Sequence, residues 1–266
     1  MKTILAFCFG FVVCINAAAE TFGNASDAWY APEEAGWGAL MVQQQSTIFL
    51  ALFVYGPDRQ PTWYSAALIF DSPSETYTGL LLVTTGPYFA EPFSAGPGGP
   101  PTIVTITPVG SVTLVAVDSD HAILTYNVGA KVVTKSIERL AYALNQLGGR
   151  YYGGFVGQAF NCNPPSLNGF LSLVANMTIT HNDSELSVAG DFQNNRGGLG
   201  SCAFAATYDQ SGHVGRANGN FICTTGEVGT FTLTRLEASI DGFLAAASFH
   251  SNACSFTGRF GAIKTD

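Results

Sequence analysis

The chain has 266 residues, of which 47% are hydrophobic and only 11% are charged, and its formal net charge is −8 at pH 7. Nucleic acids and anionic membranes bind basic patches, so this acidic, lysine-poor composition argues against both as partners. The length is sufficient for two modest hydrophobic cores.

Residues 1–19 match a secretory signal peptide. Lys2 supplies a positive charge, an apolar run covers 4–15, and three alanines end the segment at Ala19. The apolar run is shorter than the roughly 20 residues that a membrane-spanning helix needs. We therefore expect an exported protein, periplasmic or extracellular, with no integral membrane segment in its mature chain.

Residues 20–140 form the first predicted domain. Helical periodicity is nearly absent there, and short β-branched and aromatic runs alternate with Gly, Pro, Asn and Asp. The runs predict strands at 38–44, 47–55, 62–70, 77–84, 102–107, 111–117, 122–127 and 131–139. Most connections are short enough for antiparallel neighbours. The exception is the Pro- and Gly-rich segment 86–101, which is either a functional flap or a stiff crossover whose aromatic residues plug a barrel end.

Segment 141–149 is the predicted linker, and residues 150–266 form the second domain. The β pattern restarts at 151–155 and continues at 169–180, 185–193, 202–209, 214–223, 229–239, 242–250 and 254–264. Each domain thus has about eight strands in a meander, which avoids exposed edges by closing on itself. The predicted class is all-β, with two consecutive antiparallel meander domains that form small eight-stranded up-and-down β-barrels. The alternative is a pair of open sandwiches.

Four cysteines remain after the signal peptide, and all lie in the second domain. An even number in an exported chain favours disulfides over free buried thiols, and the absence of a CxxC pattern argues against zinc. Cys202 and Cys223 flank a Gly-containing turn at equal distances, so a hairpin would place them opposite each other. Cys162 then pairs with Cys254, which joins the start of the domain to its end and favours a closed barrel.

Several motifs resemble a widespread group of exported bacterial proteins of unassigned function. The segments are WYAPEEAGWG at 29–38, FVYG at 53–56, PTWY at 61–64, TTGPYF at 84–89, LTY at 124–126 and VTKSIER at 133–139. Segments 202–204 and 254–259 are similar to companion domains in such proteins. The resemblance implies export and a bacterial source but supplies no chemistry. A looser similarity to avidin and lipocalin barrels rests on meander topology alone.

Aromatic residues of the first domain are the best candidates for ligand contact, because they cluster in segments bordered by Gly and Pro. The candidate set is Trp29, Trp37, Trp63, Tyr64, Tyr88, Phe89 and Phe93. All three tryptophans of the chain belong to it. We expect the ligand to be an unidentified small molecule, a glycan or a protein.

No catalytic motif stands out, and no catalytic residue, metal site or cofactor is predicted. Glu33 and Glu34 are adjacent, so in a strand they would point to opposite faces and form a poor catalytic pair. Asp118, Asp120 and His121 offer metal ligands, but a tight hairpin explains the same residues. The leading hypothesis is a non-enzymatic binding or interaction protein. The alternatives are a secreted hydrolase acting on carbohydrate or peptide and a structural component of the cell envelope.

Overall fold

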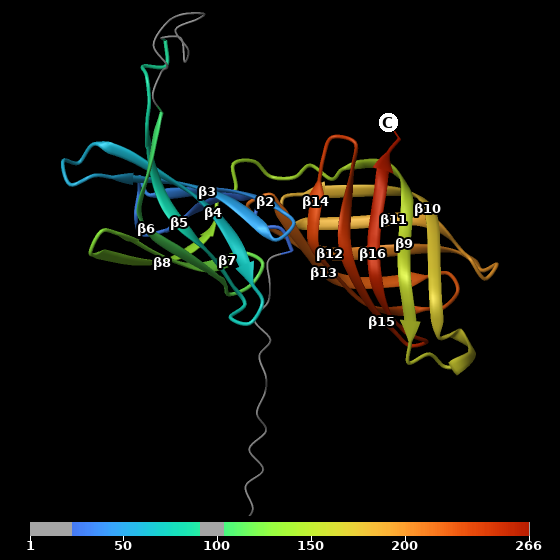
Figure 1. Ribbon diagram of the computed structural model, residues 1–266. Helices are drawn as coiled ribbons and strands as arrows, with labels where there is room; N and C mark the ends of the chain where they lie inside the picture. The colour runs from blue at the N-terminus through green and yellow to red at the C-terminus, as the bar shows by residue number, and fades with distance from the viewer. Residues whose placement is uncertain (1–22, 91–103, 266) are drawn as a thin grey trace, which may run out of the picture.

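The computed structural model describes residues 23–90 and 104–265. It contains two closed antiparallel β-barrels of eight strands each, which follow one another along the chain (Figure 1). The predicted all-β class and the barrel closure are confirmed, and open sandwiches are excluded. The signal-peptide prediction and Phe93 lie outside the described residues.

The first barrel is a meander in which each strand pairs with the next and the last pairs with the first. Its strands are β1 (Asp27–Tyr30), β2 (Gly38–Gln44), β3 (Thr47–Tyr55), β4 (Pro61–Asp71), β5 (Thr76–Thr85), β6 (Thr105–Ala116), β7 (His121–Val128) and β8 (Lys131–Arg139). Closure comes from the pairing of Trp29 with Arg139 across β1 and β8. Alternate residues point inward and are buried, as strand geometry requires.

Trp29 lies at the centre of this closure. Its side chain is 1% exposed, and its indole Nε1 donates a hydrogen bond of 3.0 Å to the carbonyl of Ala25. The guanidinium of Arg139 lies 4.6 Å from the centre of the indole ring, which is within the range of a cation–π contact. The seam between the first and last strands is therefore held by side-chain packing as well as by backbone pairing.

Two details of the strand prediction were wrong in this barrel. The separate strands expected at 102–107 and 111–117 are one strand, β6, because a bulge lies between them: Leu81 pairs with Gly110 and Leu82 pairs with Pro108. The bulge takes up the extra residue and accommodates a proline that cannot donate to the ladder. Strand β1 was not predicted, because its four residues are too few to show alternation.

The second barrel has longer strands and the same topology. Its strands are β9 (Gly149–Phe160), β10 (Gly169–Asn182), β11 (Glu185–Asn194), β12 (Leu199–Ser211), β13 (Val214–Cys223), β14 (Val228–Ala238), β15 (Gly242–Ser251) and β16 (Ser255–Lys264). A short 3-10 helix, η1 (Pro165–Leu167), lies between β9 and β10. Strand β16 pairs with β9 along its whole length and closes the barrel.

Both predicted disulfides are confirmed. Cys202 and Cys223 are directly opposite each other on β12 and β13, as the hairpin argument requires. Cys162 follows β9 and bonds to Cys254, which precedes β16. The second bond therefore joins the two strands that close the barrel.

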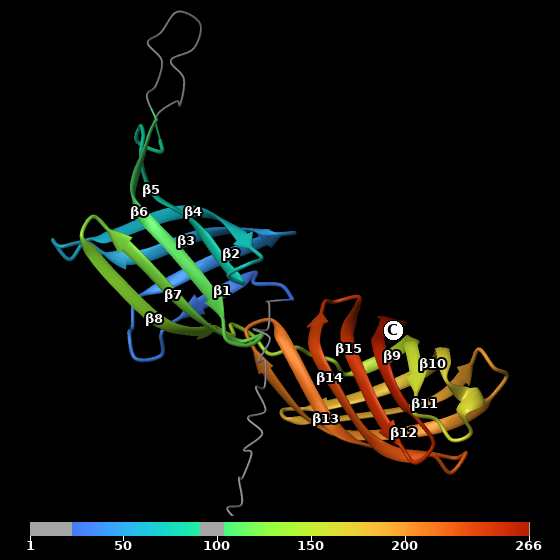
Figure 2. The same cartoon turned by 60° about the horizontal axis from the view of Figure 1, so that its bottom comes forward.

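The segment 140–148 connects the barrels and covers one end of the second. Leu147 is 3% exposed and belongs to the core of the second barrel. Asn145 donates a hydrogen bond of 2.9 Å to the Tyr208 hydroxyl, and its backbone nitrogen donates one of 2.7 Å to Gln210. This end of the barrel, which faces the first barrel in Figures 1 and 2, is consequently closed.

Polar contacts link the two barrels. Asp27 on β1 interacts with His213 at the β12–β13 turn, and Asp120 in the β6–β7 hairpin forms an ion pair with Arg216 on β13. The Ser119 hydroxyl accepts a further hydrogen bond of 2.5 Å from Arg216. The junction therefore rests on charged and polar groups.

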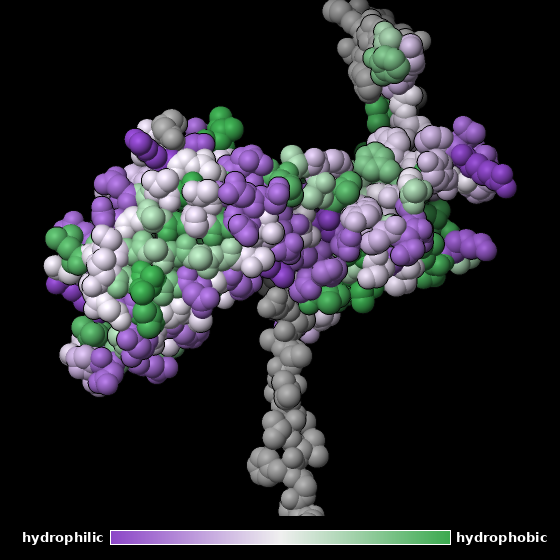
Figure 3. Space-filling model, turned by 180° about the vertical axis from the view of Figure 1, so that it is seen from behind, coloured by the Kyte–Doolittle hydropathy of each residue, from purple (hydrophilic) through white to green (hydrophobic). Residues whose placement is uncertain are grey.

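Hydrophobic side chains are also present at the surface of both barrels, among polar ones (Figure 3). Within 23–90 and 104–265, no helix has the length and apolar character to cross a bilayer.

Candidate functional site

The second barrel contains an apolar cavity of about 330 Å³ at the end away from the first barrel. The loops at this end connect β9 to β10, β11 to β12, β13 to β14 and β15 to β16. Six phenylalanines line it: Phe155, Phe192, Phe204, Phe221, Phe249 and Phe256. Leu167, Leu171 and Leu173 also line the apolar wall. The second barrel is thus a cup, closed at the junction and hollow at the opposite end.

The phenylalanines are there because of strand alternation. Each occupies an inward position of its strand, so the rings meet inside the barrel. Phe155 stacks on Phe260 with ring centres 4.0 Å apart, and Phe260 in turn contacts Phe243 at 5.0 Å. Because Phe260 and Phe243 are nearer the junction and do not line the cavity, this stack forms the floor.

Small residues account for the empty space above the floor. Ala159 on β9, Gly198 before β12 and Ala253 in the β15–β16 turn all line the cavity. None of them has a side chain long enough to reach the opposite wall. The inward positions close to the mouth therefore leave room that larger residues would fill.

Both disulfides lie at the mouth of the cavity. Cys202, Cys223 and Cys254 line it, and each bond joins two neighbouring strands. A mouth linked covalently at two places has less freedom to collapse or to open. The cavity is therefore pre-formed, which reduces the cost of ordering when a ligand binds.

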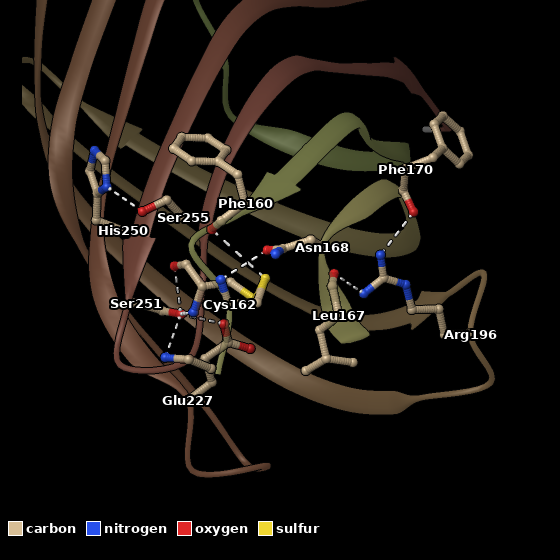
Figure 4. The surroundings of a disulfide bond; sticks show 12 residues. Phe160, Cys162, Leu167, Asn168, Phe170, Arg196, Glu227, His250, Ser251 and Ser255 are labelled. Atoms are coloured by element: carbon tan, nitrogen blue, oxygen red, sulfur yellow. Dashed lines mark hydrogen bonds between the residues drawn. A yellow bond between two sulfur atoms is a disulfide. The ribbon is translucent and has the colours of Figure 1, made fainter. Parts of the chain in front are cut away.

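Arg196 holds one side of the mouth in place. Its guanidinium donates hydrogen bonds of 2.6 Å to the carbonyl of Leu167 and 3.0 Å to the carbonyl of Phe170 (Figure 4). Nearby, the side-chain oxygen of Asn168 accepts a hydrogen bond of 2.9 Å from the backbone nitrogen of Cys162. These bonds fix η1 and the β9–β10 loop against the β11–β12 hairpin.

Ser251 has the same role on the opposite side. Its hydroxyl donates to the Glu227 carboxylate at 2.7 Å and accepts from the backbone nitrogens of Ala253 and Cys254 at 3.1 and 3.0 Å. Figure 4 shows Glu227 and Ser251 beside the Cys162–Cys254 bond. Glu227 and Arg196 are the charged side chains that line the cavity in the part of the chain that the structure describes.

A second concavity is larger but shallow. A groove of about 880 Å³ crosses the outer face of β10–β13 and is lined by short polar side chains, including Asn176, Asp191 and Ser201. It follows the outside of the wall, whereas the phenylalanine cavity is surrounded by the barrel. We regard the enclosed cavity as the better candidate, because burial on several sides is what gives a small ligand its affinity.

The structure places the predicted tryptophan and tyrosine candidates in different environments. Trp29 is in the core, and Trp37 is half-buried with its indole nitrogen 3.2 Å from the Tyr126 hydroxyl. Tyr64 is also partly buried against the core, whereas Trp63 is 50% exposed on the outer face of β4. These four residues therefore do not share one surface.

Tyr88 and Phe89 lie on the β5–β6 connection and are well exposed. Their ring centres are 4.5 Å apart, so the two side chains contact each other. Their role in ligand contact stays a prediction.

Of the acidic residues singled out in the sequence, Glu34, Asp118 and Asp120 have structural partners. Glu34 forms an ion pair with Lys135 on β8. Asp118 accepts hydrogen bonds from the backbone nitrogens of Asp120 and His121 at 2.7 and 2.8 Å, which is the expected hairpin arrangement. Burial raises the pKa of Asp118, but these bonds and the His121 ring outweigh it, and the pKa is lowered. In the described ranges, no three His, Cys, Asp or Glu side chains are grouped to hold a metal ion.

Sequence reasoning missed the phenylalanine cavity. The inward phenylalanines were identified only as parts of strands, and the alternation pattern does not show whether opposing side chains meet. One feature of the sequence could have pointed to this end of the barrel: both predicted disulfides lie at the same end of the strands.

No protein-family model matches this sequence, and no curated protein matches it either. The chain is similar in fold to the crystal structure of the isotype 1 transferrin binding protein B from serogroup B Neisseria meningitidis, at 8% identity and a TM-score of 0.29. The similarity covers 87% of this chain, which spans 66% of that one. The resemblance to exported bacterial proteins stays a prediction.

Proposed function

We propose that this protein is a non-enzymatic binding protein that holds a small apolar or aromatic molecule in the mouth of its second barrel. The observation that carries the proposal is the enclosed cavity of about 330 Å³ lined by six phenylalanines. Its volume is at the lower end of the range for small-molecule sites, roughly 300–1,000 Å³. An apolar wall of this kind favours a ligand with little charge, since burying an unpaired charge is costly.

The polar groups at the mouth fit binding better than catalysis. A glycosidase needs two carboxylates roughly 5–9 Å apart, and the cavity wall provides Glu227 alone in the described ranges. A serine hydrolase needs a histidine beside its serine, whereas Ser251 bonds to Glu227 and to the backbone. Arg196 already donates to two carbonyls, so it serves to fix the loops.

The proposed location is the periplasm or the extracellular medium. Two disulfides in one domain are typical of oxidising compartments, and the sequence begins with a segment that matches a signal peptide. A pre-formed apolar cup in such a compartment suits the capture or carriage of a molecule that water dissolves poorly.

Titration with the uncharged fluorescent probe N-phenyl-1-naphthylamine tests this function. Leu171 lines the cavity and is only partly buried, so Leu171→Trp should fill the mouth without opening the core. We expect the unmodified protein to enhance probe fluorescence with a saturable curve. The variant should bind the probe at least about tenfold more weakly, because the added ring removes the space.

Ile263→Trp is the matched control, since Ile263 is 62% exposed on the outer face of β16 and away from the cavity. It should bind the probe like the unmodified protein. Equal binding by all three proteins would place the probe elsewhere and contradict the proposal. Circular dichroism of each variant establishes that the barrels have formed.

A further inference from the structure

The outer face of β2, β3 and β4 is unusually apolar for an exposed sheet. Besides Tyr55 at the end of β3, six large hydrophobic side chains point outward there, each 45–62% exposed: Leu40, Val42, Phe49, Phe53, Trp63 and Ile69. Val42 pairs directly with Phe49, and Phe53 pairs directly with Trp63. The six residues therefore form one continuous surface, which we call the apolar face. Contiguous patches of this kind mark interaction sites.

The opposite wall of the same barrel shows what an ordinary solvent-facing surface looks like. The outward positions of β6, β7 and β8 mix the apolar residues Ile123 and Val132 with polar ones, among them Ser111, Thr125, Thr134 and Ser136, and the two threonine hydroxyls are 3.1 Å apart. Because both walls belong to one barrel and cover one core, core packing does not explain the difference. Something other than water is expected to contact the apolar face.

The apolar face carries no ionisable group. From Gly38 to Gln44, from Thr47 to Tyr55 and from Pro61 to Phe70, the strands contain no Asp, Glu, Lys or Arg, and the acidic residue of the three strands is Asp71 at the end of β4. The whole chain has a net charge of −8, so two copies repel each other over most of their surfaces. They can approach most closely where this charge is absent. An anionic lipid surface would be repelled by the same net charge.

The relief of the apolar face suits a twofold contact. Its middle row consists of Leu40, Ala51 and Ser65, so small residues occupy this row on β3 and β4. Phe53 and Trp63 stand on one side of that row, and Phe49 and Ile69 stand on the other. If a twofold axis passed through the small residues, Phe53 and Trp63 of one copy would pack against Phe49 and Ile69 of the other.

The area reaches the lower limit for a specific interface. A fully buried aromatic side chain contributes roughly 150–250 Å². With half of that for each of the three aromatic residues and somewhat less for Leu40, Val42 and Ile69, the face would bury on the order of 500–600 Å² per copy. Two copies would then bury about 1,000–1,200 Å², which is the least that a specific protein interface needs.

We propose that the apolar face is the interface of a homodimer, formed with a second copy of this chain related by a twofold axis. The two second barrels, each with its own cavity, lie outside this contact. The proposal is therefore independent of what the cavity binds.

Sedimentation equilibrium of the exported full-length protein at micromolar concentration tests the dimer. We expect twice the chain mass. Phe53→Glu should raise the dissociation constant at least about 30-fold, since a carboxylate would be buried without a partner. Val132→Glu is the control: Val132 is 69% exposed on β8, and this variant should remain dimeric.

A pair of cysteine variants tests the position of the twofold axis. In Ser65→Cys, the new thiols of two copies should crosslink under mild oxidation, whereas Ser111→Cys on the opposite wall should not. A monomer at all concentrations would overturn the proposal, as would a dimer that Phe53→Glu leaves intact. Monomers that instead bind phosphatidylcholine vesicles through this face would assign it to a lipid surface and equally overturn the dimer.

Discussion

The carboxylate of Asp27 in the first barrel accepts hydrogen bonds from both the backbone nitrogen and the ring Nδ1 of His213 in the second, at 3.0 and 2.7 Å. The same oxygen lies 3.1 Å from Nη1 of Arg139. One carboxylate therefore joins the closing strand of the first barrel to a turn of the second. Glu237, 3.9 Å from Nε2 of His213, adds a second negative charge nearby.

The contacts of Asp27 determine its titration. Burial raises the pKa of its carboxyl, but the hydrogen bonds and charge of His213 and the bond from Arg139 outweigh burial and leave the pKa below its ordinary value. A carboxyl whose pKa is lowered by folding stabilises the protein above its unfolded pKa. That contribution disappears as the pH falls through the lower, folded pKa.

Asp27→Asn should therefore lower the free energy of unfolding by about 2 kcal/mol at neutral pH, since a charge-assisted hydrogen bond is lost. The difference from the unmodified protein should vanish only below the folded pKa, well below about pH 4, where the carboxyl is protonated in the folded as well as the unfolded chain. Urea unfolding followed by tryptophan fluorescence measures this, because all three tryptophans are in the first barrel. Asp58→Asn, in the exposed β3–β4 turn, is the control and should change little at either pH. If Asp27→Asn lowered the free energy of unfolding by the same amount in acid as at neutral pH, the lowered pKa of Asp27 would be contradicted.

The two disulfides should differ in their contributions to stability. They close segments of 92 and 21 residues, which correspond in the chain-entropy model to about 4.6 and about 3.3 kcal/mol. Replacing Cys162 and Cys254 together by Ser should thus cost about 1 kcal/mol more than replacing Cys202 and Cys223. Urea denaturation of the two double variants makes the comparison. The reverse order would show that local strand pairing matters more than loop closure.

Gly110 tolerates no side chain. A Cβ there would lie 1.7 Å from the backbone oxygen of Asn127, which pairs with Val132 on β8 and is held in place by that pairing. We expect Gly110→Ala to destabilise the first barrel by about 2–3 kcal/mol through this clash. Gly86→Ala, where the nearest atom would be 3.7 Å away, should be nearly neutral. Equal thermal stability of the two variants would mean that the bulge at this position can shift.

Trp29→Phe should destabilise the protein much more than Trp63→Phe. Trp29→Phe removes a hydrogen bond to Ala25 and weakens the contact with Arg139, so we expect a loss of about 2–3 kcal/mol in unfolding free energy. Trp63→Phe on the apolar face should cost less than about 0.5 kcal/mol in the monomer. Thermal unfolding at low protein concentration separates the two effects. A large loss for Trp63 would indicate a role in the fold that its exposure does not suggest.

Most of the fold could be predicted because strand alternation and turn residues are local properties. The range 38–44 was correct to the residue, and Cys202 opposite Cys223 follows from one hairpin. The bulge at Pro108 was not predictable, since it depends on how β5 and β6 align.

The cavity was not predictable for a related reason. Alternation indicates that Phe192 and Phe204 face inward, but it does not show how far their rings reach across the barrel. The empty volume depends on Ala159 and Gly198, which meet those rings only once the strands are closed. The contacts between Asp27 and His213 could not be predicted either, because they depend on how one barrel is placed against the other.

Native mass spectrometry of the exported protein, purified without detergent, tests the binding proposal most directly. We predict a non-covalent adduct of a small apolar molecule that is retained in Ile263→Trp and lost in Leu171→Trp. A bare chain mass in the unmodified protein, together with the absence of saturable probe binding, would contradict it. An adduct that Leu171→Trp retains would show that the second barrel's cavity is not the binding site.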